Sequence, residues 1–336
     1  MSTTPAPGHR FAERPLRVAV VGAGPAGDYA ADILTKAERD FGVSIDLFDR
    51  YPAPYGLIRY GVAPDHPRIK GIVNALHKVL DRGDIRFLGN VTYGRDLKLS
   101  DIRDMYDAVI FATGAIKDAP LNIPGIELEG SFGAADFVSW YDGHPDVPRE
   151  WPLEAKEIAV IGNGNVALDV ARVLAKTGEE MLATDIPPHV HEALLRKTTT
   201  DVHVFARRGP AYAKFSPLEL RELNHSPNVE VIVHPEGFDV DAHGMEHIAQ
   251  HKAQKMVLNT LTSWVGAEPV GKPHRIHLHF AEAPVEILGD GAGVTTLRTE
   301  RTHSPDEDGT VVGTGEVTDW DVQAVYRAVG YRSSAL

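Results

Sequence analysis

A glycine-rich turn after an apolar run constrains the fold of this chain more than any other feature. Residues 18–22 are rich in Val and Ala, as in a buried parallel strand, and Gly22, Gly24 and Gly27 then form a G-x-G-x-x-G pattern. Apolar residues at helical spacing follow from Tyr29 to Ala37. In such a unit the first glycine permits a tight turn, the second lets backbone approach a pyrophosphate, and the third lets helix and strand pack closely. Because the helix N-terminus also favours anions, the pattern predicts a dinucleotide site.

An acidic residue and a long loop follow this turn. Asp49 ends the next predicted strand, residues 44–48, and stands 27 residues after Gly22. The usual spacing is about 20 residues, and a longer helix absorbs the difference. An acid at this strand end accepts hydrogen bonds from a ribose hydroxyl. Residues 50–70 then hold four prolines, two glycines and several aromatic side chains, which predicts a long ordered loop with a functional role.

A second strand–turn–helix unit begins at Glu157. Gly162, Gly164 and Ala167 form the variant pattern G-x-G-x-x-A, and helical spacing follows at once. The next predicted strand, residues 201–206, ends in Arg207 and Arg208 where the first unit has an acid. An acid would repel the 2′-phosphate of NADP, whereas two guanidinium groups bind it in a bidentate manner. The second unit is therefore predicted to bind NADP rather than NAD.

Composition excludes several classes of function. The 336 residues suffice for two domains, and their formal net charge of −13, from 34 basic and 47 acidic residues, argues against nucleic acid or an anionic membrane as partner. No apolar run approaches the ~20 residues of a membrane span. Residues 1–14 lack the apolar core of a secretory signal and are expected to form a disordered tail, which favours a cytoplasmic protein. The absence of cysteine excludes a disulfide, a C-x-x-C motif and a Cys-ligated iron–sulfur cluster in this chain.

Histidines crowd residues 224–279. His247 and His251 have the i, i+4 spacing of a zinc-binding helix, but Ile248 stands where the H-E-x-x-H motif has its glutamate. We therefore expect solvated surface histidines and no metal site. Just before this segment, Ser216 and Pro217 predict the start of a helix that carries Glu219 and Glu222 on one face.

The order of these motifs resembles the adrenodoxin reductase-like ferredoxin–NADP⁺ reductases, from about Arg17 to Tyr331. The most specific segments are Y-G-L-I-R-Y-G-V-A-P-D-H-P-R-I-K at 55–70 and G-N-G-N-V-A-L-D-V-A-R at 162–172, followed by R-R-G-P and E-L-R-E-L. The resemblance implies FAD on the first unit, NADPH on the second, and hydride transfer between them. Electrons would then pass singly to a ferredoxin or a similar iron–sulfur protein, since flavin links two-electron to one-electron chemistry.

The motifs and the resemblance together assign site residues. The FAD contacts expected are Gly22, Gly24, Ala26, Gly27, Asp49, Leu57 and Val91. The NADP contacts expected are Asn163, Gly164, Asn165, Val166, Arg207, Arg208 and Glu219. His66 and Glu222 match positions near the flavin and nicotinamide. His66 either relays a proton or only holds its loop, and Glu222 either orients the nicotinamide or pairs with a base.

We expect an α/β fold of two doubly wound, Rossmann-like dinucleotide-binding domains. The NADP domain, residues 116–324, is inserted into the FAD domain, residues 15–115 and 325–336. The family continues through a G-W-x-K-R-G-P-x-G segment that contacts the flavin and has no counterpart here, so the FAD domain is expected to be incomplete. Two alternatives stay open. One is the NADPH-oxidising subunit of the glutamate synthase type, whose cysteine-ligated clusters this chain cannot form, and the other is an NADP(H)-binding fragment without turnover.

Overall fold

The computed structural model describes residues 11, 13–303, 311–333 and 335. The chain divides into two compact units, with boundaries after Ile116 and after Arg332. Of the tail expected at residues 1–14, most lies outside the described residues. Arg14 is described, and its guanidinium donates to both carboxylate oxygens of Asp107 at 2.6 and 2.7 Å.

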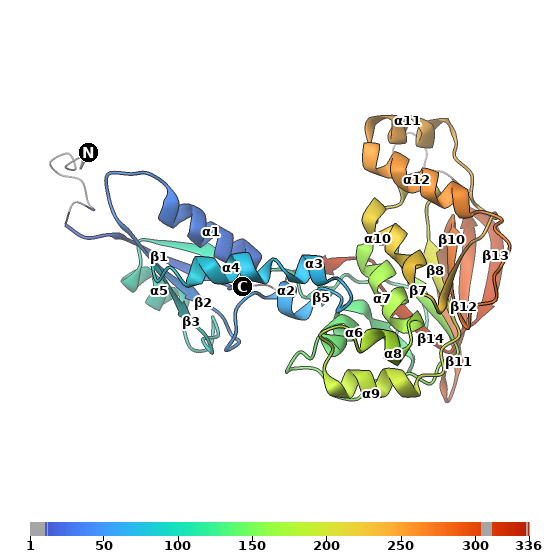
Figure 1. Ribbon diagram of the computed structural model, residues 1–336, viewed down its shortest axis with the longest axis horizontal. Coiled ribbons are helices and arrows are strands. Elements are labelled where there is room, and N and C mark those ends of the chain that lie inside the picture. Colours follow the sequence, from blue (N-terminus) through green and yellow to red (C-terminus); the bar gives the residue numbers. More distant parts are fainter. Residues whose placement is uncertain (1–10, 12, 304–310, 334, 336) are drawn as a thin grey trace. The chain divides into compact units, whose positions relative to one another are not determined.

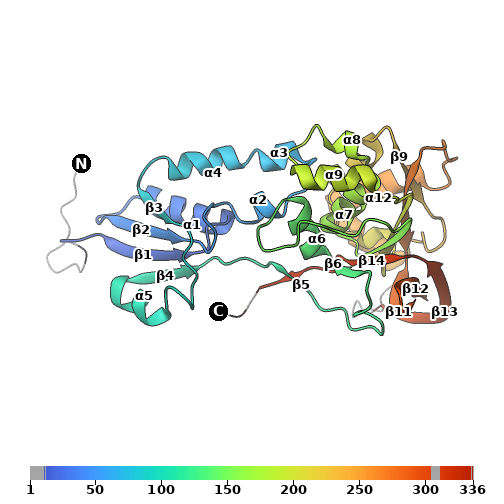
Figure 2. The same cartoon turned by 90° about the horizontal axis from the view of Figure 1, so that it is seen from below.

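The first unit is built on a four-stranded parallel sheet in the order β3-β2-β1-β4 (Figures 1 and 2). Its strands are β1 (Leu16–Val21), β2 (Val43–Phe48), β3 (Ile85–Leu88) and β4 (Ala108–Phe111). Its helices are α1 (Pro25–Lys36), α2 (Leu57–Tyr60), α3 (Pro67–Lys70), α4 (Val73–Leu80) and α5 (Leu99–Met105). Helices α1 and α4 cover one face through Ala31 and Val79, and α5 covers the other through Ile102. Strand β1 is apolar on both faces because helices cover both.

The second unit is built on a six-stranded parallel sheet in the order β6-β14-β7-β8-β10-β9. Its strands are β6 (Ser131–Gly133), β7 (Glu157–Ile161), β8 (Asp201–Ala206), β9 (Val229–Val233), β10 (His274–Phe280) and β14 (Ala324–Arg327). Its helices are α6 (Ala134–Tyr141), α7 (Asn165–Ala175), α8 (Gly178–Met181), α9 (Pro188–Arg196), α10 (Pro217–Glu222), α11 (Ala242–Gln250) and α12 (Lys252–Trp264), with 3₁₀ turns at Pro210–Tyr212 and Leu223–His225.

A smaller antiparallel sheet packs on one face of this parallel sheet. It consists of β11 (Glu282–Asp290), β12 (Gly293–Thr302) and β13 (Gly313–Asp321), and a separate pair joins β5 (Lys117–Asp118) to β15 (Tyr331–Arg332). Phe205 of the parallel sheet meets Ile287 and Leu297 of the antiparallel sheet in one buried cluster. The hairpin expected at Asp290–Gly291 joins β11 to β12. Among the described residues, no helix is both long enough and apolar enough to cross a membrane.

The structure corrects one expected boundary. The sequence predicts residues 325–336 in the FAD domain, but β14 lies between β6 and β7 in the second unit, with Val325 opposite Ala159. Figure 2 shows β14 beside β6. Tyr326 of this strand is fully buried there. The apolar run predicted a strand correctly, yet a run buried on both faces gives no information about which sheet it joins. The predicted fold class, two parallel-sheet units of the dinucleotide-binding type, is confirmed.

Candidate dinucleotide-binding sites

Two glycines of the first turn are required by the fold itself. The Gly22 N–H donates to the Phe48 carbonyl at 2.8 Å, and its φ of 105° lies in the region that favours glycine. A Cβ atom on Gly22 would lie 2.4 Å from the Ala112 oxygen, and one on Gly27 would lie 1.9 Å from the Gly22 oxygen. The tight turn and the close packing of helix on strand therefore both exclude a side chain, as the pattern predicts.

Gly24 is different, because nothing in the fold requires a glycine there. Its backbone is extended, with φ −81° and ψ 180°, which any residue adopts. A Cβ atom would meet only the Gly56 Cα, at an ordinary 3.8 Å. Gly24 is also the N-cap of the twelve-residue helix α1, which no side chain caps. This leaves open space in front of a helix N-terminus, and that space fits the close approach of a pyrophosphate.

Asp49 holds the glycine turn through both oxygens of its carboxylate. Its Oδ2 accepts from the Ala23 N–H and its Oδ1 accepts from the Tyr51 N–H, each at 2.9 Å. The Asp49 carbonyl accepts from the Val91 N–H at 2.9 Å. Each carboxylate oxygen has a further lone pair, so a ribose hydroxyl can still donate to it. The predicted contacts of Asp49 and Val91 thus lie together at the carboxyl end of β2.

The proline-rich loop is held over the same turn by an unusual backbone. Tyr55 has a φ of 87°, which is rare for a residue with a side chain, and its N–H donates to the Ala23 carbonyl at 2.6 Å. Leu57 then begins α2, and it is partly exposed. His66 is buried at the start of α3, where its N–H donates to the Ala63 carbonyl at 3.0 Å. A bulky residue held at positive φ is typical of functional loops.

Sequence reasoning missed Asp28, in the first turn of α1. Its side chain is fully buried, and neither carboxylate oxygen has a hydrogen-bond partner among the described residues. Burial, with a smaller contribution from Asp49, raises the pKa of this carboxyl to about 7. The signal in the sequence was an acid three positions before the buried Ala31, and thus on the apolar side of the helix.

The second unit repeats the same division of roles between its glycines. A Cβ atom on Gly162 would lie 2.3 Å from the Ala328 oxygen, so the fold excludes a side chain there. A Cβ atom on Gly164 would meet nothing within 4 Å, and its backbone is extended with φ −110° and ψ 177°. Gly164 is the N-cap of the eleven-residue helix α7, again without a side-chain cap. Here too the open space lies in front of a helix N-terminus.

Both asparagines of the second turn hold the segment that carries the arginines. The Asn163 amide donates to the Tyr212 carbonyl at 3.2 Å, and the Asn163 carbonyl accepts from the Lys214 N–H at 2.9 Å. The Asn165 side chain accepts from the Ser216 N–H at 2.8 Å. Residues 212–216, which follow the arginines, are thus fastened to the glycine turn. Val166 lies beside this turn in the first turn of α7.

The two arginines emerge from an anchored backbone at the carboxyl end of β8. The Arg207 carbonyl accepts from the Thr302 hydroxyl at 2.8 Å, and the Arg208 carbonyl accepts from the Ala281 N–H at 3.2 Å. Arg207 is exposed, and the Arg208 guanidinium lies 5.8 Å from the Tyr212 ring centroid. Two guanidinium groups that follow the strand next to β7, whose turn opens α7, are suited to bind a phosphate.

The two glutamates of α10 differ in their surroundings. Glu219 is buried with its carboxylate 3.6 Å from the buried Arg172 of α7, which also donates to Asp169 at 2.8 Å. Glu222 is only half-buried. Glu219 therefore belongs to a buried ion network, and its predicted NADP contact remains a prediction. Glu222 and His66 lie in different units of the chain.

The expectation of solvated histidines is wrong for part of the segment. His243 and His251 are exposed on and just after α11, but His279 is only 4% exposed and its ring stacks on His234 at 4.2 Å between centroids. His277 lies on the same strand and the same face. Trp320 of β13 packs against this face, 4.5 Å from His279. The burial comes from the antiparallel sheet, which the sequence alone did not place.

Comparison with known proteins agrees with this geometry. Residues 16–209 match the family described as pyridine nucleotide-disulphide oxidoreductase. The Arabidopsis thaliana protein named NADPH:adrenodoxin oxidoreductase, mitochondrial, is 38% identical over 332 residues, which cover 95% of this chain and 68% of the relative. NADPH-ferredoxin reductase FprA of Mycobacterium tuberculosis is 38% identical over 325 residues, which cover 95% of this chain and 71% of the relative.

A solved structure supports the same relationship. That of Mycobacterium tuberculosis FprA in complex with NADPH superposes with a TM-score of 0.89 at 38% identity, covering 96% of this chain and 72% of that chain. Fold, glycine turns and sequence identity all lead to one group of oxidoreductases. The chain belongs to the adrenodoxin reductase-like ferredoxin–NADP⁺ reductases, within the pyridine nucleotide-disulphide oxidoreductase family.

Proposed function

We propose that this chain binds FAD on its first unit and NADP(H) on its second, and passes electrons from NADPH to a ferredoxin-type iron–sulfur protein one at a time. The observation that carries the proposal is the pair Gly24 and Gly164. At both positions the fold tolerates a side chain, and both lie in front of a helix N-terminus. A glycine without a structural need, repeated in two units, fits two dinucleotides that each need close backbone approach.

The first unit would hold the flavin cofactor through its backbone and one acid. Gly22, Gly24, Ala26 and Gly27 line the turn and first helical residues, whose N–H groups would bind the pyrophosphate. Asp49 would accept from the adenosine ribose while it keeps its bonds to Ala23 and Tyr51. When bound, FAD supplies the link between two-electron and one-electron transfer. Leu57 and Val91 would pack against the cofactor as apolar neighbours.

The second unit would select NADP through charge. Asn163, Gly164, Asn165 and Val166 form the turn that meets the pyrophosphate, and Arg207 with Arg208 would bind the 2′-phosphate. Glu219 would contact NADP while its carboxylate stays paired with Arg172. His66 would relay a proton or keep the proline-rich loop in place, and Glu222 would orient the nicotinamide.

The absence of cysteine limits the possible electron acceptors within these 336 residues. They contain no pair of thiols, so they cannot carry out the disulphide chemistry that gives the family its name. Electrons that arrive from NADPH would therefore pass to a centre outside these residues. This also disfavours the glutamate synthase alternative, whose iron–sulfur clusters need cysteine ligands.

Absorbance of the purified chain tests the proposal first. Bound FAD gives bands at roughly 380 and 450 nm, which anaerobic NADPH should bleach in a stoichiometric titration. Ferredoxin-dependent reduction of cytochrome c then measures single-electron delivery. A colourless protein that still binds NADPH, and stays colourless when FAD is added, would favour the binding fragment without turnover. A flavin band that NADPH does not bleach would contradict electron transfer from the second unit.

A further inference from the structure

Asp28 is a buried acid that the proposed function does not use. It lies in the first turn of α1, four residues after the N-cap Gly24, and its N–H donates to the Gly24 carbonyl at 3.0 Å. Since an α-helix rises by about 1.5 Å per residue, Asp28 lies roughly 6 Å along the helix axis from the turn that would meet the FAD pyrophosphate. Its side chain is fully buried, and neither carboxylate oxygen has a hydrogen-bond partner among the described residues.

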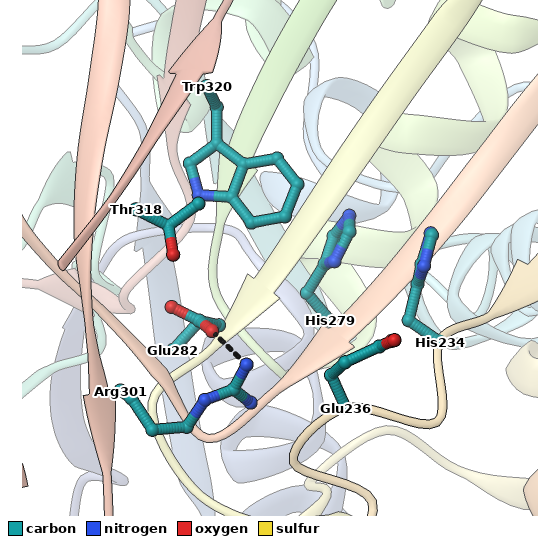
Figure 3. Close-up of a pocket in the computed structure, with 7 residues that line it drawn as sticks. All are labelled: His234, Glu236, His279, Glu282, Arg301, Thr318 and Trp320. Atoms are coloured by element: carbon teal, nitrogen blue, oxygen red, sulfur yellow. Dashed lines mark ion pairs between the residues drawn. The ribbon is translucent and has the colours of Figure 1, made fainter. Parts of the chain in front are cut away.

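Two other buried acids show the usual arrangement of such a group. Glu282 of β11 is 2% exposed, and its carboxylate pairs with Arg301 at 2.9 Å. Figure 3 shows this ion pair in a pocket of the second unit. In the first unit Arg86 donates to both carboxylate oxygens of Asp46, at 2.8 and 2.6 Å. Asp28 has no such cation bonded to it, so a negative charge on its carboxylate would be uncompensated.

The surroundings of Asp28 therefore favour its protonated form. An ionised carboxylate that is removed from water without a partner costs several kcal/mol, and the group takes up a proton instead. Burial, with a smaller contribution from Asp49, raises the pKa of Asp28 to about 7. The folded chain thus loses this proton only near and above neutral pH.

Two titratable groups on other elements face Asp28. Asp49, at the carboxyl end of β2, acts on Asp28 as a like charge. Tyr55 belongs to the proline-rich loop, which covers the glycine turn; burial raises the pKa of Tyr55, and the charge of Asp28 adds to this effect. Three further charged or titratable groups lie next to Tyr55 rather than at Asp28, namely Arg59, His77 and Asp81.

The charge of Asp28 matters because of what the glycine turn would bind. The N-terminal end of α1 favours negative charge, and FAD would bring the charges of two phosphate groups to it. An ionised Asp28 would add a further negative charge one helical turn away, beside that of Asp49. Like charges repel more strongly in a buried, poorly screened environment than in water. A protonated Asp28 would leave the field of the helix N-terminus to the pyrophosphate.

We propose that FAD binds to the form of the chain in which Asp28 carries a proton, so that binding takes up a proton from solvent wherever the free chain has lost it. This inference rests on the FAD site proposed for the first unit. The proton comes from the buffer and adds to a carboxylate oxygen of Asp28, and no bond of FAD changes. Asp28 is thus a positioning residue that acts on the pyrophosphate through charge, and it makes flavin loading depend on pH.

Calorimetric titration of the flavin-free chain with FAD at pH 6 and pH 8 tests the proposal. With a pKa of about 7, about one tenth of the chains carry the proton at pH 8, so FAD should bind about tenfold more weakly there than at pH 6. Repeating the pH 8 titration in buffers with different enthalpies of ionisation counts the protons taken up. We expect about one proton per FAD. No proton uptake at pH 8 would overturn the proposal without the use of any variant.

Two variants assign the effect to Asp28. Asp28→Asn keeps the shape of the side chain and cannot ionise, so its FAD affinity should be the same at pH 6 and pH 8, without the proton uptake. Asp32→Asn, one turn further along α1, is the matched control. Burial raises the pKa of Asp32, but hydrogen bonds from Arg82 and Lys36 outweigh this and lower it, so Asp32 stays ionised at both pH values. This control should keep the tenfold fall.

The outcomes separate this inference from the proposed function. Circular dichroism and melting temperatures check that both variants fold. An equal fall of affinity with pH in Asp28→Asn and Asp32→Asn would overturn the role of Asp28 and leave the FAD site standing. Absence of FAD binding at both pH values in the original chain and in both variants would overturn the FAD site itself, and the inference with it.

Discussion

The Asn163 side chain donates to the Tyr212 carbonyl at 3.2 Å and so fastens the second glycine turn to the segment that carries Arg207 and Arg208. The turn would meet the pyrophosphate and the arginines the 2′-phosphate, so this bond helps to set the spacing between two anion sites, together with the bonds from the Lys214 and Ser216 N–H groups to the two asparagines. Replacing Asn163 with Ala should weaken NADPH and NADH alike, by roughly 0.5–1.5 kcal/mol for one lost hydrogen bond. Fluorescence titration with both nucleotides measures this, and a loss confined to NADPH would contradict it.

The arginine pair should act on NADPH alone. Replacing Arg207 and Arg208 with Ala removes two charge-assisted contacts and should weaken NADPH by roughly 2–4 kcal/mol. NADH has no 2′-phosphate, so its affinity should hardly change. The same titrations decide the matter: if both nucleotides lose affinity equally, the arginines do not bind the 2′-phosphate.

The two N-cap glycines form a matched pair of variants. Gly24→Val should abolish FAD binding and leave NADP binding intact, whereas Gly164→Val should do the reverse, since each side chain fills the space kept for one cofactor. Melting temperatures of the cofactor-free proteins should stay close to that of the original chain. Gly22→Ala is the contrast, because its Cβ would meet the Ala112 oxygen and should destabilise the fold. Stoichiometric FAD in purified Gly24→Val would refute this placement.

Asp28 should make the stability of the first unit fall as pH rises. Its pKa is raised from 3.8 to about 7 in the folded chain by burial, with a smaller contribution from Asp49. Between these values the folded state keeps a proton that the unfolded state releases, so the free energy of unfolding decreases by at most about 1.4 kcal/mol per pH unit. Urea unfolding of FAD-free protein at pH 5 to 8 measures the slope, and Asp28→Asn should flatten it. An unchanged slope in the variant would show that other groups cause the dependence.

Docking of an acidic ferredoxin must rely on a local basic patch, because the chain itself carries a net charge of −13. Arg59 and Arg68 are exposed in the proline-rich loop, with Lys70 beside them. Reversing Arg68 and Lys70 to Glu should slow electron transfer to ferredoxin and flatten its dependence on ionic strength. Reduction of a small neutral acceptor by NADPH should survive. If both activities fall together, Arg68 and Lys70 support the flavin site rather than the docking of ferredoxin.

The sequence predicted what depends on short spacing. Both glycine turns, the arginines after β8 and the family all follow from residues that are close in the chain, and the fold class is confirmed. What it missed depends on strand order. Nothing in an apolar run says that β14 joins β6 and β7. Likewise His277 and His279 alternate as on one strand face, but only the order β8-β10-β9 brings them to His203 and His234.

The sequence also did not predict the second role of residues that serve two purposes. Asp49 was expected to meet a ribose, and it also orients the glycine turn through Ala23 and Tyr51. Glu219 was assigned to NADP by resemblance, and its carboxylate lies in an ion pair with Arg172. Such contacts depend on tertiary distances that residue type and spacing do not encode.

The unequal roles of the glycines carry an evolutionary consequence. A descendant that lost its cofactors but kept its fold would still be selected to retain Gly22 and Gly162, since their Cβ atoms would strike the backbone of Ala112 and Ala328. Gly24 and Gly164 would be released and would drift towards alanine or serine. The presence of the middle glycine in each turn would therefore indicate whether a lineage still binds the nucleotide of that unit. Because the two turns are separate, loss of flavin and loss of NADP could be distinguished.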